Sequence, residues 1–204
     1  TGGTALSQRR YEDHYGRLAK KQGFPARSVF KLQEMQERFH LLRPGDRVLD
    51  LGASPGSWSQ YCLQRLGARG RLTAVDLHEL RIPTPPAPAF HFLQADLFDP
   101  QLEARLGEAG PYDLVLSDAA PETSGSHLVD TQSSLELASR AVALAVALLR
   151  PGGHAVVKIF QGGEEKQLLD RLKEVFQRAR AFKPTASRSE SREVYFLGLG
   201  RKGK

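Results

Sequence analysis

The stretch from Arg47 to Trp58 constrains the fold more than any other part of the chain. It reads Arg-Val-Leu-Asp-Leu-Gly-Ala-Ser-Pro-Gly-Ser-Trp, a short apolar run followed by small residues. The run predicts a buried strand over 47–51, and the amphipathic pattern after it predicts a helix over 56–66. A buried strand that ends in a glycine-rich turn and opens a helix is the first βα unit of a nucleotide-binding sheet.

Two glycines in this turn, Gly52 and Gly56, allow the backbone to approach a ligand closely, and the helix start offers unpaired N–H groups. Their spacing matches neither G-x-G-x-x-G nor G-x-x-x-x-G-K-[ST], so the motif favours neither a nicotinamide dinucleotide site nor a P-loop. A plain tight turn between a strand and a helix is the alternative that this motif alone leaves open.

Strands and helices alternate along the rest of the chain. Further strands are predicted over 71–75, 90–94, 112–117 and 154–160, and further helices over 100–108, 130–149 and 163–178. This alternation implies an α/β fold with a mostly parallel sheet and helices on both faces. Arg180 to Lys183 and Glu193 to Leu199 predict two strands with no helix between them, and therefore an antiparallel hairpin at the sheet edge.

The region before the first strand is predicted to be helical. Residues 7–22 predict a polar, basic helix, and Ser28 is expected to cap a second helix that carries an apolar stripe. At 204 residues the whole chain, 1–204, is expected to form one domain. We expect a basic N-terminal helical extension over 1–43, a Rossmann-like core over 44–199 and a basic tail over 200–204.

The net charge of +6 is distributed unevenly along the chain. Residues 1–43 hold nine Lys and Arg against four Asp and Glu, and residues 166–204 hold eleven against four. The middle, 44–165, holds nine against fifteen. An acidic centre between basic flanks predicts a small-ligand site next to surfaces for a polyanion such as RNA. For any single basic cluster, a solvated helix face is the alternative.

Several classes of protein are disfavoured by composition. The lone Cys62 excludes an internal disulfide and a cysteine-rich metal site, and the six histidines show no ligand spacing, so no metal site is expected. No apolar run reaches the length of a membrane span, and the start of the sequence shows no secretion signal. We therefore expect a cytoplasmic protein that does not enter a membrane.

Polar residues follow the predicted strands, where an open α/β sheet binds its ligands. Asp50, Asp76, Asp96 and Asp118 stand at the ends of the first four strands, and Lys158 lies in the fifth. Asp76 suits ribose hydroxyls, and Asp96 suits an exocyclic amine. Each carboxylate alone could be a turn or cap residue. Lys158 lies among apolar residues and needs a partner, so a structural ion pair with Asp118 is the alternative to a functional role.

Four segments of the sequence resemble the FtsJ/RrmJ family. They are Asp50–Gln60, Ser117–Pro121, Val157–Lys158 and Glu193–Phe196, and the resemblance runs from about Ser28 to Leu199. Members of this family are S-adenosylmethionine-dependent RNA ribose 2′-O-methyltransferases. The resemblance implies a Rossmann-like class I methyltransferase fold, with a seven-stranded sheet whose last strand is antiparallel. Ser54 and Ser57 depart from the family pattern, because many members have Ala and Gly there.

The resemblance also implies roles for individual residues. The family's Lys-Asp-Lys-Glu tetrad falls on Lys31, Asp118, Lys158 and Glu193. Lys158 is expected to be the general base, Asp118 to orient it near the methyl sulfonium, and Lys31 and Glu193 to orient the ribose. The expected contacts of S-adenosyl-L-methionine are Gly52, Gly56, Trp58, Asp76, Asp96 and Asp118. The expected substrate is a uridine of large-subunit (23S) ribosomal RNA, bound within a ribosomal particle by a monomer.

Other functions are also compatible with parts of the sequence. Methyltransferases that act on a base nitrogen usually add an aromatic residue that Asp118-Ala-Ala-Pro lacks, and carbon-5 enzymes need a nucleophilic cysteine. A small-molecule O-methyltransferase would leave the basic flanks without a role. A non-catalytic RNA-binding assembly factor, or a 2′-O-methyltransferase of transfer RNA or another RNA, stays open.

Overall fold

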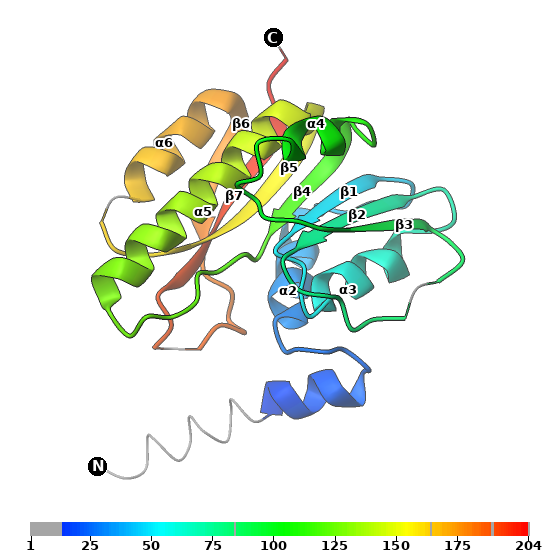
Figure 1. Ribbon diagram of the computed structural model, residues 1–204, viewed down its shortest axis with the longest axis horizontal. Coiled ribbons are helices and arrows are strands. Elements are labelled where there is room, and N and C mark those ends of the chain that lie inside the picture. Colours follow the sequence, from blue (N-terminus) through cyan, green and yellow to red (C-terminus); the bar gives the residue numbers. More distant parts are fainter. Residues whose placement is uncertain (1–13, 84, 164, 189, 204) are drawn as a thin grey trace.

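A computed structural model describes residues 14–83, 85–163, 165–188 and 190–203. A seven-stranded sheet in the order β3-β2-β1-β4-β5-β7-β6 forms its centre (Figure 1). The strands are β1 (Arg47–Leu51), β2 (Arg71–Asp76), β3 (Ala89–Gln94), β4 (Tyr112–Ser117), β5 (Leu149–Phe160), β6 (Phe176–Phe182) and β7 (Glu193–Arg201). The pairs among β1 to β5 are parallel, and β7 runs antiparallel to both β5 and β6. The predicted fold class is confirmed.

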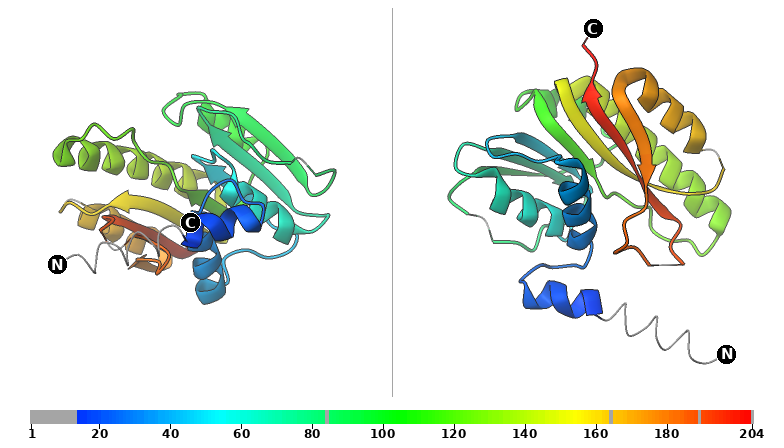
Figure 2. Two further views of the ribbon diagram at one scale, coloured as in Figure 1. Left: turned by 90° about the horizontal axis from the view of Figure 1, so that it is seen from below. Right: turned by 180° about the vertical axis from the view of Figure 1, so that it is seen from behind.

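Helices cover both faces of the sheet, as the alternation of elements predicted (Figure 2). The helices are α2 (Val29–Phe39), α3 (Ser57–Leu66), α4 (Leu102–Gly107), α5 (His127–Leu148) and α6 (Glu165–Val175). Buried residues of α2 and α3 join one hydrophobic core, and those of α4, α5 and α6 join a second core on the other face. Within the described residues, no helix is both long enough and apolar enough to span a bilayer.

The segment before the sheet is partly described. Residues 14–21 are helical, which agrees with the predicted basic helix; the rest of that prediction lies outside the described residues. α2 falls within the predicted N-terminal extension, yet its Val29, Leu32 and Met35 are buried in the first core. Ser28 holds the predicted capping position before α2, but its side chain makes no cap hydrogen bond. Its main-chain oxygen instead accepts a bond from Trp58 Nε1 at 2.8 Å.

The C-terminal hairpin is present, but its first strand begins earlier than predicted. The predicted helix over 163–178 ends at Val175, and β6 begins at Phe176 rather than at Arg180. Phe176 is fully buried, and its ring lies against Gly198 of β7, where a Cβ atom would meet the ring at 2.6 Å. Glycine at that position therefore makes room for an aromatic ring at the sheet edge, which favours a strand over another helical turn.

Candidate active site

The predicted glycine turn connects β1 to α3 and contacts the segment after β4. Gly52 has φ +71°, and a Cβ atom there would lie 2.5 Å from Ala119 Cα. Gly56 has φ +117° at the start of α3, and a Cβ atom there would lie 2.5 Å from a methyl group of Ile82. Both positions therefore require glycine, for backbone conformation and for space. The close approach of Gly52 to Ala119 brings the ends of β1 and β4 together.

A cavity of about 660 Å³ opens at the carboxyl ends of the strands. It is lined by groups from β1 to β5 and the segments after them, among them Gly52, Asp76, Asp96, Asp118 and Lys158. Leu77 and Phe98 also line it, and both are more than half exposed, at 58% and 51%. The cavity thus combines carboxylates with apolar side chains that are free to contact a flat ring.

The carboxylates of the cavity are held by main-chain N–H groups. Asp76 accepts bonds from Ser54 N at 2.9 Å and from His78 N at 2.8 Å, and Asp96 accepts one from Phe98 N at 2.9 Å. These bonds hold the acidic side chains in place before any ligand arrives. An acidic, partly apolar cavity of this size fits S-adenosylmethionine, which carries a sulfonium, an ammonium group, ribose hydroxyls and an adenine ring.

Two of the predicted cofactor residues do not line this cavity. Gly56 lies at the start of α3 against Ile82, and Trp58 is buried, with its ring 5.7 Å from that of Tyr195. The Trp58 indole bond to Ser28 ties α3 to the segment that leads into α2. The structure therefore places Gly56 and Trp58 in the scaffold around the cavity.

Ser57, which departs from the family pattern, has a contact that glycine could not make. Its hydroxyl accepts a bond from Ala26 N at 2.7 Å and donates one to Ala26 O at 3.1 Å. The side chain is buried at the start of α3. The serine therefore fixes the segment before α2, and Lys31 lies in the first turn of that helix.

The four residues of the predicted tetrad lie together at one edge of the cavity. Lys158 Nζ is 2.7 Å from the main-chain oxygen of Asp118, 3.2 Å from Asp118 Oδ1 and 3.9 Å from Glu193 Oε1. Lys31 Nζ is 2.6 Å from Glu193 Oε2. The order of the sheet explains this meeting, since β5 lies between β4 and β7. The ion pair of Lys158 with Asp118, the alternative left open by the sequence, is therefore present within a larger cluster.

The charges of the cluster stabilise one another. Burial alone would raise the pKa of Glu193, but the ammonium groups of Lys31 and Lys158 and hydrogen bonds from Lys31 and Ser191 lower it overall. Glu193 is therefore ionised at neutral pH. Lys158 is 6% exposed, which is unusual for a lysine. Its three oxygen neighbours explain how it is tolerated there.

Tyr195 belongs to the cluster and was missed in the sequence. It pairs with Lys158 across β5 and β7, and its hydroxyl donates to Asp118 Oδ1 at 2.7 Å. Burial, together with the charges of Asp118 and Glu193, raises the pKa of this phenol well above its usual value, so it keeps its proton. The sequence Glu193-Val-Tyr195 could have predicted that Tyr195 lies beside Glu193, because residues two apart on a strand project from the same face.

Asp50 lies beneath the glycine turn and not in the cavity lining. It is fully buried, Ser59 Oγ donates to its Oδ2 at 2.6 Å, and its Oδ1 has no hydrogen-bond partner. Burial raises its pKa to about 7, and the charges of Asp118 and Asp76 add to the effect. Cys62 is also buried nearby, and burial raises the pKa of its thiol, which disfavours a thiolate nucleophile. Among the described residues, no group of His, Cys, Asp and Glu side chains could hold a metal ion.

A second cavity of about 430 Å³ lies on the other side of the tetrad. Its lining consists of Arg27, Ser28, Lys31, Arg188, Glu190, Ser191 and Glu193. Ser28 lines both cavities. The tetrad thus stands between an acidic cavity, which Lys158 lines, and a cavity of mixed charge, which Lys31 and Glu193 line.

Comparison with known proteins places this arrangement in a family. The model of the FtsJ-like methyltransferases matches residues 24–201. This chain belongs to the FtsJ-like methyltransferase family. Membership confirms the resemblance found in the motifs and the predicted enzyme class, an S-adenosylmethionine-dependent methyltransferase.

This chain also has similar relatives over nearly its whole length. A ribosomal RNA large subunit methyltransferase E of Treponema denticola is 47% identical over 94% of this chain and 96% of its own. The protein of the same name from Sorangium cellulosum is 48% identical over 93% and 88%. A solved ribosomal RNA methyltransferase of Plasmodium falciparum is 25% identical, with a TM-score of 0.75, covering 89% of this chain and 100% of its own.

Proposed function

We propose that this protein transfers a methyl group from S-adenosylmethionine to the 2′-hydroxyl of a uridine ribose in large-subunit (23S) ribosomal RNA. Relatives named for large-subunit ribosomal RNA methylation, at 42% to 48% identity over almost all of the chain, support this substrate. The basic flanks of the sequence support a polyanionic partner.

The observation that carries the proposal is the position of the Lys158 amine. It lines the acidic cavity and lies 3.9 Å from a Glu193 oxygen that belongs to the second cavity. A ribose in the second cavity and a methyl donor in the first would meet at this amine. The amine is therefore the group best placed to accept a proton from the hydroxyl that attacks.

Each member of the tetrad then has a distinct task. Once its ammonium group has released a proton to solvent, Lys158 Nζ accepts the proton of the 2′-hydroxyl, while the main-chain oxygen and Oδ1 of Asp118 hold the amine in line. Lys31 and Glu193, joined at 2.6 Å, orient the ribose from the second cavity. When bound, S-adenosylmethionine supplies a methyl group activated by its sulfonium. The Asp118 carboxylate stabilises positive charge beside that methyl group.

The acidic cavity holds the cofactor through residues at the ends of β1, β2 and β3. Gly52 lets the backbone approach the cofactor. Asp76 accepts hydrogen bonds from its ribose hydroxyls, and Asp96 accepts one from its exocyclic amine. Gly56 and Trp58, two other predicted contacts, shape the wall from behind. We further propose that the protein acts as a monomer in the cytoplasm, on RNA within a ribosomal particle.

The proposal is tested by the product. The purified protein is given S-adenosylmethionine with a labelled methyl group and large ribosomal subunits from cells that lack the gene, with protein-free 23S RNA and transfer RNA in parallel. We expect label in large-subunit RNA only, recovered after nuclease digestion as 2′-O-methyluridine, in a linkage that resists alkali. Label in a base or in transfer RNA, or RNA binding without any label, would contradict it.

A further inference from the structure

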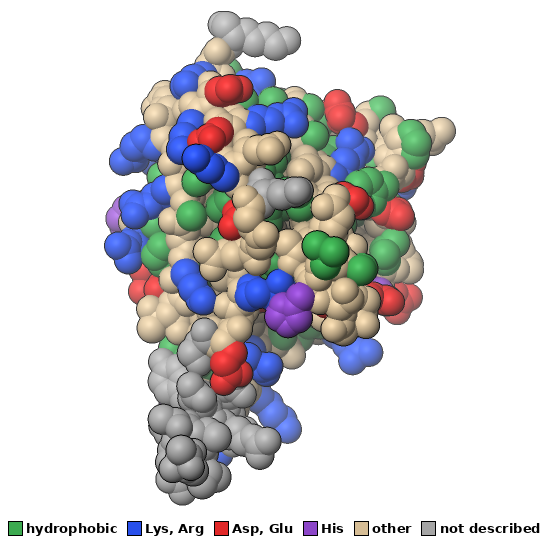
Figure 3. Space-filling model, turned by 90° about the vertical axis from the view of Figure 1, so that its left-hand side faces the viewer, with side chains coloured by type: hydrophobic (Ala, Val, Ile, Leu, Met, Phe, Trp, Pro, Cys, Tyr) green, Lys and Arg blue, Asp and Glu red, His purple; other side chains and the backbone are tan. Residues whose placement is uncertain are grey.

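Four exposed arginines lie outside both cavities. They are Arg38 at the end of α2, Arg43 in the loop after it, and Arg178 and Arg180 on the edge strand β6. Together they are called the arginine surface. Figure 3 shows lysine and arginine side chains gathered on the side of the molecule that carries β6 and α6.

Two aromatic rings fix part of this surface. The rings of Phe39 and Phe182 meet edge to face, with centroids 5.2 Å apart. The Arg38 guanidinium lies 5.2 Å from the centroid of Phe182, and that of Arg180 lies 5.5 Å from the centroid of Phe39. Stacking on a ring holds a guanidinium in position while its N–H edge stays free for an acceptor.

The rest of the surface continues along β6. Arg178 and Arg180 are two residues apart, so they project from the same face of the strand. Arg178 is also near His154, where its charge, with those of Arg43 and Arg150, adds to burial in lowering the pKa of the imidazole. That repulsion shows that Arg43 and Arg178 both lie close to the His154 imidazole.

Within the part of the chain that the structure describes, the arginine surface forms no ion pair. Arg150 forms an ion pair with Asp113, but none of the four members of the arginine surface pairs with a carboxylate of the described residues. Unpaired, exposed and partly ordered guanidinium groups are what a phosphate backbone binds most strongly. An ordinary solvated surface would not need the two aromatic supports.

The surface lies within reach of the proposed catalytic residues. Arg38 and Lys31 both lie on α2, seven residues apart, which corresponds to about 10 Å along a helix. Glu193 of the tetrad lies on β7, the strand that pairs with β6. Arg180 and Arg178 pair with Leu197 and Leu199 of β7, so they lie about 13 and 20 Å along that strand from Glu193. RNA that places a ribose at Lys158 would therefore reach Arg38 first and the β6 arginines several nucleotides from the target.

We propose that the arginine surface binds phosphates of the RNA that flanks the target nucleotide. The inference rests on the proposed function, since it assigns the surface to the same substrate. A protein partner would leave a different pattern, because interfaces are built around apolar anchors. The exposed large apolar side chains of the described residues are Leu77, Phe98, Leu128 and Val129, and none of them belongs to α2 or β6.

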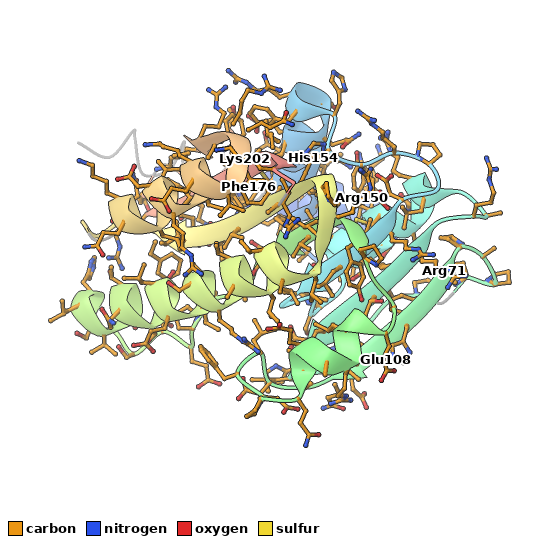
Figure 4. The ribbon with its side chains drawn as sticks, turned by 90° about the horizontal axis from the view of Figure 1, so that it is seen from above. Arg71, Glu108, Arg150, His154, Phe176 and Lys202 are labelled. Atoms are coloured by element: carbon orange, nitrogen blue, oxygen red, sulfur yellow. The ribbon has the colours of Figure 1, made fainter. Side chains whose placement is uncertain are left out.

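The test compares two double variants of equal charge change. Arg178→Glu/Arg180→Glu alters the surface. Arg69→Glu/Arg71→Glu alters two exposed arginines just before and at the start of β2, in the other half of the sheet. Figure 4 shows Arg71 on that side, away from His154 and Arg150. The affinity of each full-length protein for a 23S RNA fragment is measured between 50 and about 300 mM salt, with no cofactor, alongside thermal melts.

We expect the surface variant to bind RNA at least tenfold more weakly, with a salt slope smaller by about 1.5, as for two lost phosphate contacts. The control variant should stay within about twofold of the wild type. If the surface variant melts early, Arg43→Glu/Arg178→Glu, which touches no ring, replaces it with the same expectation. Equal affinities for the surface variant and the wild type, or equal losses in both double variants, would overturn the proposal.

A methylation assay of the same proteins, run in parallel with the binding measurements, separates this inference from the proposed function. A wild type that methylates 23S RNA while the surface variants bind it normally contradicts the arginine surface alone. A wild type that methylates no RNA contradicts the proposed function, whatever the binding data show.

Discussion

Lys158 Nζ lies 2.7 Å from the main-chain oxygen of Asp118 and 3.2 Å from its carboxylate oxygen Oδ1, so a single residue holds the amine by two acceptors. A lysine side chain on its own is flexible, and two anchors from one neighbour restrict both its position and its direction. The arrangement depends on the ends of β4 and β5 lying side by side, which the parallel pairing of these strands ensures.

Tyr195 is predicted to hold the Asp118 carboxylate, and through it the Lys158 amine, in position. Tyr195→Phe removes the hydroxyl that donates to Asp118 Oδ1, and losing one hydrogen bond of about 1.4 kcal/mol predicts roughly a tenfold fall in kcat. Cofactor affinity should change little, because Tyr195 does not line the acidic cavity. Tyr112→Phe is the matched control, since that buried hydroxyl donates to Leu106 O away from the site. Equal kcat values for the two variants would remove Tyr195 from the site.

The glycine turn makes a second prediction about cofactor binding. Gly52→Ala would place a Cβ atom 2.5 Å from Ala119 Cα, a main-chain atom that cannot move aside easily. Calorimetry should show that S-adenosylmethionine affinity falls at least tenfold. Gly45→Ala is the control, because Gly45 also has a positive φ, +90°, but open space around it. Gly45→Ala should lose some stability from backbone strain and keep its affinity. A Gly52→Ala protein that binds the cofactor like the wild type would show that this turn does not form the site.

Asp50 predicts how stability depends on pH. Its pKa is about 7 in the folded protein, against 3.8 as the ordinary value, so the folded state holds a proton that the unfolded state has lost. The stability from this group is therefore complete below about pH 4 and is lost as the pH rises through 7. At about 1.4 kcal/mol per pH unit, the loss approaches roughly 4 kcal/mol.

Asp50→Asn removes the titrating group and should flatten this part of the profile. Urea unfolding of both proteins at pH 5 and pH 8 measures the difference. The wild type should lose stability relative to Asp50→Asn as the pH rises. Parallel profiles for the two proteins would mean that Asp50 is already ionised at pH 5.

The sequence predicted the βα order well because each buried strand is a short apolar run bounded by turn residues. β4, predicted over 112–117, has those bounds, and α3 begins one residue after the predicted start because Gly56 takes the position before it. Errors came where tertiary contacts decide the outcome. The helix predicted to Arg178 stops at Val175, because Phe176 packs against Gly198, a residue more than twenty positions away.

The sequence predicted the site residues that stand at strand ends. It did not predict the positions of residues that depend on packing between distant elements. Asp76, Asp96, Asp118 and Lys158 share one cavity because parallel strands deliver their ends to one edge. Trp58 has a polar atom and lies in the motif, but its indole points to Ser28 O, which no sequence pattern reveals. The arginine surface was also hidden, since α2 and β6 are far apart in the chain and meet through contacts of Phe39 and Phe182 that no local pattern reveals.

Lys158 gives the most direct test, by single-turnover methylation of large ribosomal subunits from cells that lack the gene, with the wild type and with Lys158→Arg. A guanidinium keeps its proton near neutral pH, so it can replace the charge beside Asp118 but cannot act as the base. The account predicts that Lys158→Arg melts like the wild type, binds both cofactor and RNA, and is at least about a hundredfold slower. A well-folded Lys158→Arg that methylates RNA at the wild-type rate would contradict the account.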